Sequence, residues 1–281
     1  MRLDKPIGTW LLAWPSFWAL AMAPPAGALP DATLVALFGL GAVLLRGSGC
    51  TLNDMLDRDV DRQVERTKGR PLARGALRRR QALALLAAQL GLGFGIWLQL
   101  PFEAQALGIC SLGLVGVYPL MKRFMNAPQL VLGLAMNWGV LMGWAASTSA
   151  WPVWPAALPL FGAGVAWTLV YDTIYAFQDI RDDERVGVRS TARSWEAVAR
   201  PAMGLCAAAA GAALAAAGGA VDAGPLYYAG AAAFVGHLAW QVAATDLKSR
   251  AVCNRAFESN KWAGGILAAG IFLDHALHGM L

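Results

Sequence analysis

Apolar positions in this chain come in long blocks that are separated by short polar or turn-forming segments. A helix needs about 20 mostly apolar residues to cross a bilayer, and nine blocks reach roughly that length. Turn signals such as Pro24-Pro25, Leu100-Pro101 and Gly224-Pro225 separate several of them. We therefore expect nine transmembrane helices, at 6–24, 33–52, 82–100, 104–121, 128–147, 154–176, 201–219, 226–243 and 262–280.

The composition agrees with an all-α polytopic membrane protein. Of 281 residues, 57% are hydrophobic and only 15% are charged, and the mean hydropathy is +0.47. Soluble domains carry about a quarter charged residues. We treat residues 1–281 as a single integral-membrane domain, and the four scattered cysteines predict neither a disulfide framework nor a metal site.

The basic residues divide the loops into two sets. All of the 23 Lys and Arg residues except Arg2, Lys5 and Arg46 lie in four alternate loops, at 53–81, 121–127, 177–200 and 244–261. The positive-inside rule places these loops and the N-terminus in the cytoplasm. The run Arg78-Arg79-Arg80 suits anionic lipid headgroups, and we expect no nucleic-acid partner.

The first 23 residues resemble a signal peptide, but Pro15 and several Trp residues are unusual in such a segment. We expect it to remain as the first span. The location that we predict is a bacterial inner membrane, or a mitochondrial inner membrane if a presequence was removed.

The stretch that ends the second span is rich in carboxylates. If the helix continues, Asp54, Asp57 and Asp61 share one face, Asn53 borders it, and Asp59 points away. Such hard oxygen ligands suit Mg²⁺. The alternative is a solvated acidic helix end.

A second acidic stretch ends the sixth span. Asp172, Asp179 and Asp183 share one face of a continued helix, and Asp182 does not. Both stretches are predicted on the same membrane face, and each is followed by a basic loop. This repetition favours a metal-binding role for the two acidic stretches.

Two charges lie inside apolar segments, where ionisable groups are costly and usually functional. Asp172 is one of them. Arg46 shares the face of Asn53 and Asp57 but lies about 10 Å deeper. Arg46 either pairs with one of these acids or anchors the carboxylate of a substrate.

Two facing Mg²⁺–carboxylate clusters would bind a polyanion, and a diphosphate bridges two metals well. Charge-assisted hydrogen bonds would come from Lys68, Arg70, Lys122 and Arg123. An apolar, aromatic cavity suits a hydrocarbon tail, so a prenyl diphosphate fits both ends. Tyr171 and Tyr175 could stabilise an allylic cation through cation–π attraction, and Asp172 is the candidate base for an aromatic acceptor.

At this point the motifs resemble the UbiA superfamily of intramembrane aromatic prenyltransferases. Asn53-Asp54-x-x-Asp57-x-x-x-Asp61 and Asp179-x-x-x-Asp183 look like its two aspartate motifs, and Tyr118-x-x-x-Lys122 looks like a third. The segments 2–8, 46–51, 70–72 and 190–192 are similar to those of 4-hydroxybenzoate polyprenyltransferases of ubiquinone synthesis. The resemblance covers residues 2 to about 195.

The resemblance implies an all-α fold of nine helices around a central cavity. It also implies Mg²⁺ dependence and prenylation of 4-hydroxybenzoate ortho to its hydroxyl, with a polyprenyl diphosphate as donor. By motif position it implies that the two aspartate motifs bind metal and diphosphate, and that Lys122 and Arg123 bind the diphosphate. Arg46 and Tyr171 then remain our candidates for contact with the aromatic acid. Phe177 and Ile180 depart from the pattern of close relatives, which bears on subgroup rather than activity.

Three rival functions stay open at this stage. The acceptor could be homogentisate, a naphthoate or haem. The chain could be a transporter that uses Asp172 and Arg46 as coupling groups, although its acids cluster at span ends. A structural membrane subunit would leave both acidic stretches unexplained.

Overall fold

The computed structural model describes residues 3–25, 27–62, 67–152, 154–181 and 189–277, and these residues form helices and no strands. The first helices along the chain are α1 (Ile7–Met22), α2 (Ala32–Leu56), α3 (Arg58–Asp61), α4 (Arg79–Trp97) and α5 (Phe102–Phe124). The next are α6 (Pro128–Asn137), α7 (Gly139–Thr148) and α8 (Trp154–Ala176). The last are α10 (Thr191–Ser194), the 3₁₀ turn η1 (Glu196–Val198), α11 (Ala199–Gly219), α12 (Pro225–Ala244) and α13 (Arg250–Ala276).

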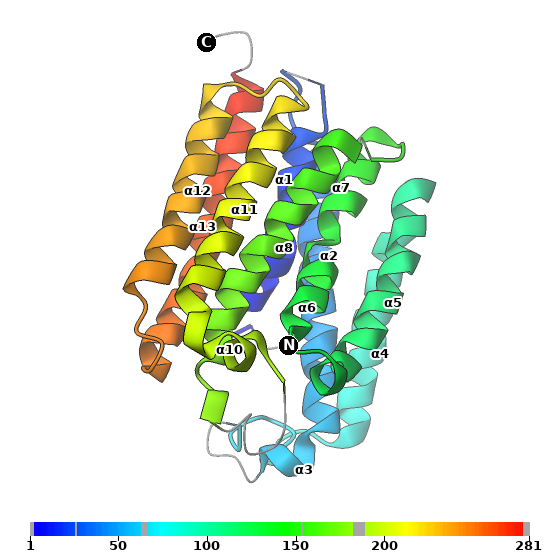
Figure 1. Ribbon diagram of the computed structural model, residues 1–281. Helices are drawn as coiled ribbons and strands as arrows, with labels where there is room; N and C mark the ends of the chain where they lie inside the picture. Colours follow the sequence, from blue (N-terminus) through cyan, green and yellow to red (C-terminus); the bar gives the residue numbers. More distant parts are fainter. Residues whose placement is uncertain (1–2, 26, 63–66, 153, 182–188, 278–281) are drawn as a thin grey trace.

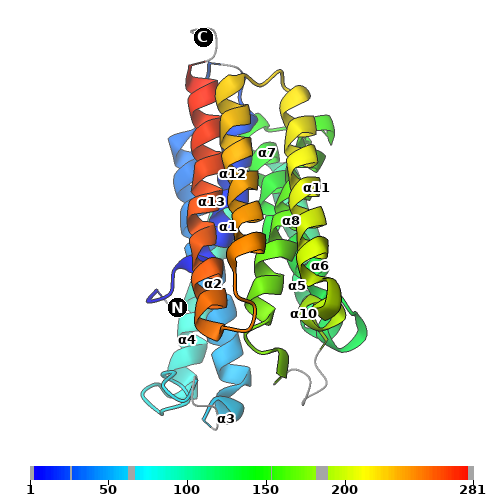
Figure 2. The ribbon, with the colours of Figure 1, turned by 60° about the vertical axis from the view of Figure 1, so that its left-hand side comes forward.

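The long helices run side by side in one bundle (Figures 1 and 2). Helix α8 packs against α11 and α6, α12 packs against α13, and α1 packs against α7, α13 and α2. The short helix α3, which forms the end of the first acidic stretch, and the short helix α10, which follows the second, lie at the same end of the bundle in both views. The fold therefore brings both acidic stretches to one end.

Aromatic side chains fill the core between α1, α8 and α12. The rings of Trp18, Trp167 and Phe234 contact one another with centroids 5.2 to 5.8 Å apart. A buried indole N–H needs an acceptor, and Trp18 donates to the carbonyl of Gly264 while Trp167 donates to Oδ1 of Asn260. These bonds fix α13 against α1 and α8.

Helices α12 and α13 approach closely at a pair of glycines. A Cβ atom added to Gly230 would lie 2.8 Å from the Cα of Gly270. Small residues of this kind allow helices to pack backbone to backbone in a membrane. At the end of the same pair, the carboxylate of Asp274 accepts hydrogen bonds from the backbone N–H groups of Gly224, Leu226 and Tyr227, and so caps α12.

The nine predicted segments all coincide with helices, with two differences. The segment 128–147 is divided at Trp138, where Asn137 donates its side-chain amide to the Gly133 carbonyl and to Thr168. The last helix begins at Arg250, twelve residues before the predicted span, because its first three turns are polar and a hydropathy pattern overlooks them.

The protein is a multi-pass membrane protein. Four stretches of the described chain are long and apolar enough to cross a bilayer: 32–56, 128–148, 154–176 and 196–219. Helix α1 belongs to the same bundle, because Trp18 and Leu20 are fully buried against the core.

Candidate active site at the acidic end of the bundle

The first acidic stretch keeps a nearly helical path although α2 itself ends at Leu56. Asp57 is the C-cap, so the prediction of one continuous helix through Asp61 is wrong at this residue. The i to i−4 bonding nevertheless continues, because the Asp57 N–H donates to the Asn53 carbonyl and the Asp61 N–H donates to the Asp57 carbonyl. The helical spacing of Asp54 and Asp61 therefore survives the bend.

Arg70 connects these two carboxylates. Its Nη1 lies 3.1 Å from Oδ1 of Asp54 and 2.9 Å from Oδ2 of Asp61. The side chains are 19%, 14% and 8% exposed, respectively. Thr67 supports the arrangement, because its hydroxyl donates to the Asp61 carbonyl and its own carbonyl accepts from the Arg70 N–H. The loop that follows the first stretch thus supplies its counter-charge.

The remaining residues of this stretch are more open. Asn53 and Asp57 are exposed, as is Lys68 in the following loop. Asp59 is 84% exposed and lies 3.6 Å from Arg62, an exposed pair that contributes little. Asp59 therefore stays outside the Asp54–Asp61 pair, as its spacing predicts.

The second acidic stretch differs from its prediction. Helix α8 ends at Ala176. After one more i to i−4 bond, from the Phe177 N–H, the N–H groups of Gln178 and Asp179 make the tighter i to i−3 bonds, to Tyr175 and Ala176. Asp172 and Asp179 therefore do not share one face of a continuous helix. Asp179 is half-buried in the turn. Asp182 and Asp183 lie outside the described residues.

Helix α10 is hydrogen-bonded to α8 and to α6. The hydroxyls of Thr191 and Thr173 are 2.6 Å apart, and the Thr191 N–H donates to Oε1 of Gln129. Arg189 donates to the Phe124 carbonyl. This places the second acidic loop beside the connection between α5 and α6. The side chains of Lys122 and Arg123, our diphosphate candidates there, lie outside the described residues.

An aromatic wall stands beside the last turns of α8. The ring of Phe257 on α13 lies 4.6 Å from that of Tyr175 and 5.8 Å from that of Tyr171. Tyr171 is 2% exposed, packs edge-on against Trp167, and accepts a hydrogen bond from Thr168. Tyr175 is half-buried and so more open to a ligand than Tyr171. The hydropathy pattern contained no signal for Phe257.

Arg46 lies deeper in the bundle than the acidic stretches, against the start of α1. Its guanidinium covers Gly8, and Arg46, Asp172 and Tyr118 are near enough to Tyr171 to act on its hydroxyl electrostatically. Arg46 is exposed, and within the described part of the chain the structure records neither an ion pair nor a hydrogen bond for it. The sequence left two roles for Arg46, an ion pair with a neighbouring acid or an anchor for a substrate carboxylate. The structure gives the ion pair no support, so the role of substrate anchor stays our prediction.

The carboxylates at this end of the bundle fit a Mg²⁺ site in which a phosphorylated ligand supplies some of the metal ligands. Among the residues that the structure describes, no three His, Cys, Asp or Glu side chains converge as metal ligands. The pair Asp54 and Asp61 does converge on one cationic nitrogen. Mg²⁺ is usually held by one or two carboxylates together with phosphate oxygens, rather than by an all-protein cage. The residues present therefore fit a metal that arrives with, or is completed by, a phosphorylated ligand.

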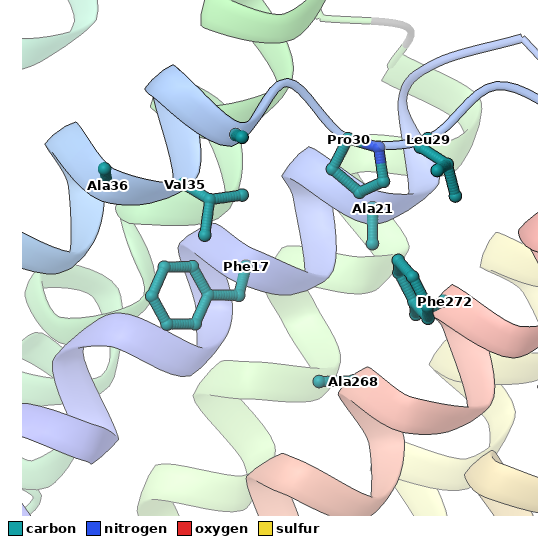
Figure 3. Close-up of a pocket in the computed structure, with 9 residues that line it drawn as sticks. Phe17, Ala21, Leu29, Pro30, Val35, Ala36, Ala268 and Phe272 are labelled. Atoms are coloured by element: carbon teal, nitrogen blue, oxygen red, sulfur yellow. The ribbon is translucent and has the colours of Figure 1, made fainter.

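A separate apolar pocket of about 460 Å³ lies at the other end of the bundle, between α1, α2 and α13. Figure 3 shows Phe17, Val35 and Phe272 projecting into it, and its other lining residues are also apolar: Ala21, Leu29, Pro30, Ala32, Ala36 and Ala268. It offers no hydrogen-bonding side chain and can accommodate only hydrocarbon.

Carboxylates gathered at one end of a multi-pass helical bundle, next to an aromatic wall, are the arrangement that we expect of an intramembrane prenyltransferase. The model of the UbiA prenyltransferase family matches residues 12–265. The chain belongs to this family.

Similar proteins include two mitochondrial 4-hydroxybenzoate polyprenyltransferases. The protein from Arabidopsis thaliana is 51% identical over 98% of this chain and 67% of its own length. The protein from Caenorhabditis elegans is 47% identical over 96% of this chain and 76% of its own length.

Solved structures agree on the fold. The apo structure of a UbiA homolog from Aeropyrum pernix K1 has a TM-score of 0.77 at 26% identity and covers 98% of this chain and 99% of that one. A UbiA homolog from Archaeoglobus fulgidus bound to GPP and Mg²⁺ has a TM-score of 0.66 at 14% identity, with 98% of each chain covered.

Proposed function

We propose that this protein transfers a polyprenyl group from a polyprenyl diphosphate to the ring carbon ortho to the hydroxyl of 4-hydroxybenzoate, in ubiquinone biosynthesis. Similarity to the two 4-hydroxybenzoate polyprenyltransferases over nearly the whole chain supports the reaction. The observation that supports this acceptor is the Arg46 guanidinium, which has no ion-pair partner in the described structure and, like Asp172, lies within electrostatic range of the Tyr171 hydroxyl. A carboxylate on the acceptor would satisfy it.

The acidic stretches would hold Mg²⁺ through Asp54 and Asp61, with Asn53, Asp57, Asp179 and Asp183 as the further candidate ligands. When bound, Mg²⁺ would neutralise the diphosphate as it leaves. The Mg²⁺-bound homolog from Archaeoglobus fulgidus supports this cofactor at the level of the family fold. Arg70 and Lys68, with Lys122 and Arg123, would donate charge-assisted hydrogen bonds to the diphosphate oxygens.

The side chains then contribute to the reaction in three ways: they stabilise the cation, orient the acceptor and activate its ring. The C–O bond to diphosphate breaks and leaves an allylic cation, which the Tyr175 ring face stabilises by cation–π attraction. Arg46 orients the acceptor so that its ortho carbon attacks the cation. Asp172 accepts a hydrogen bond from the phenol and so raises the electron density of the ring, and the proton of the substituted carbon afterwards passes to the released diphosphate.

Water must be excluded while the cation exists. The packed rings of Trp167, Tyr171 and Phe257 form a dry wall beside Tyr175. In this role Tyr171 is a wall residue that shapes the acceptor pocket, and Tyr175 is the aromatic residue nearest to the reacting carbon.

The topology that supports this function has nine crossings in a single domain, 1–281, with the N-terminus and the acidic loops in the cytoplasm. The distribution of Lys and Arg supports it. A bacterial inner membrane was our first prediction, but the relatives are named as mitochondrial and lend it no support. Fractionation of the native cell, followed by immunodetection in plasma-membrane and mitochondrial fractions, decides between the two.

The test of function is product formation by the purified protein in lipid nanodiscs with Mg²⁺ and a polyprenyl diphosphate. Three acceptors are offered in parallel, namely 4-hydroxybenzoate, homogentisate and a hydroxynaphthoate, with a control that contains no acceptor. We expect a prenylated 4-hydroxybenzoate by mass spectrometry and stoichiometric release of diphosphate. A product with another acceptor only would overturn the substrate, and absence of diphosphate release with every acceptor would overturn the enzyme class.

A further inference from the structure

Gly8 occupies an unusual place at the start of α1. It is buried in the first turn of the helix, directly beneath the Arg46 guanidinium of α2. A Cβ atom added to Gly8 would collide with Nε of Arg46 and would lie 2.8 Å from its Cζ and 2.9 Å from its Nη2. Only a residue without a side chain leaves this position open to the guanidinium.

Backbone conformation does not explain the glycine. Gly8 is helical and is absent from the residues with positive φ in the described chain. Glycine is a poorer helix former than alanine, so the helix alone would favour alanine at this position. The space taken by Arg46 is the remaining reason for glycine.

We propose that Gly8 is a positioning residue that sets the Arg46 guanidinium at the height where it receives the carboxylate of the aromatic acceptor. This inference rests on the proposed function, because it takes Arg46 as the acceptor's anchor. A guanidinium pairs with a carboxylate through two parallel hydrogen bonds and is sensitive to its own placement. The planar guanidinium of Arg46 packs directly on the backbone of α1 at Gly8, where no side chain intervenes.

The geometry makes Gly8→Ala a selective perturbation. The colliding atoms belong to the far end of a long, flexible side chain, so the guanidinium moves and the helix does not. A displacement of about 1 Å at a substrate-positioning group can reduce a rate by up to about 10²-fold. The effect should therefore fall on an anionic acceptor and spare both the donor and a neutral acceptor.

The experiment compares Gly8→Ala with wild type in nanodiscs at saturating polyprenyl diphosphate and Mg²⁺. We expect the KM for 4-hydroxybenzoate to rise about tenfold, the KM for donor to stay within twofold, and the rate with methyl 4-hydroxybenzoate to be unchanged. Gly41→Ala is the matched control on α2, because a Cβ there meets nothing within 4 Å. We expect it to match wild type.

A double-mutant cycle gives the decisive readout. If Gly8 acts through Arg46, then Arg46→Met and the double variant Gly8→Ala/Arg46→Met have the same KM for 4-hydroxybenzoate, and the effects are not additive. Additive effects, an unchanged KM in Gly8→Ala, or an equal rise in Gly41→Ala would each overturn the proposal. Failure of the proposed function is seen separately, as wild-type protein that does not prenylate 4-hydroxybenzoate.

Discussion

Arg70 and Asp61 meet across the loop that follows the first acidic stretch, where Nη1 of Arg70 donates a 2.9 Å hydrogen bond to Oδ2 of Asp61. The same nitrogen pairs with Asp54. The two carboxylates proposed to hold Mg²⁺ thus share one protein cation as their counter-charge.

Replacing Arg70 by glutamine should destabilise the metal-free protein more than the loaded protein. Without Arg70, two largely buried carboxylates lose their shared partner, which costs about 1–3 kcal/mol. Mg²⁺ with an unreactive diphosphate analogue should restore most of the loss. The measurement is the Tm in EDTA and in Mg²⁺ plus analogue. Arg74→Gln, an exposed change in the same loop, is the control, and an equal Tm drop in both conditions would contradict the role.

The carboxylates should differ sharply in their effect on turnover. Asp54→Asn, Asp57→Asn or Asp179→Asn should reduce kcat at least 100-fold, because each removes a charge proposed to hold Mg²⁺ and diphosphate. Asp59→Asn should stay within twofold, since the Asp59 side chain is 84% exposed and its ion pair with Arg62 is at the surface. Diphosphate release gives the rates, and similar losses for Asp57→Asn and Asp59→Asn would refute the assignment.

Tyr175 should act through its ring face and not through its hydroxyl. Tyr175→Phe should keep kcat within about threefold, and Tyr175→Leu should reduce it about 2- to 30-fold, the range of a cation–π interaction. Phe257, 4.6 Å from the ring, holds it in place, so Phe257→Leu should give a smaller loss. Single-turnover rates of diphosphate release measure the chemical step. Equal rates for Tyr175→Phe and Tyr175→Leu would show that the aromatic face is not needed.

Helical periodicity correctly predicted which side chains lie together when they belong to one helical stretch. It failed where the chain turns, and it could not predict contacts between elements that are distant in the sequence. The i, i+7 spacing of Asp54 and Asp61 correctly placed them together. The same reasoning failed for Asp179, because nothing in the pattern signals the i to i−3 turn after Ala176. The Arg70 pairing depends on the fold of a loop, and the Gly8–Arg46 and Tyr175–Phe257 contacts depend on tertiary packing that spacing cannot encode.

The close packing of α12 on α13 at Gly230 and Gly270 should contribute to the stability of the fold, independently of the candidate active site. A Cβ at position 230 would lie 2.8 Å from the Gly270 Cα, a backbone atom that can move only with its helix. Overpacking of this kind costs about 1–3 kcal/mol, so Gly230→Ala should lower the Tm in nanodiscs. Gly236→Ala on the same helix, where a Cβ meets nothing within 4 Å, should be neutral or slightly stabilising because alanine is the better helix former. A Tm for Gly230→Ala equal to that for Gly236→Ala would mean that α12 and α13 do not pack this closely in the membrane.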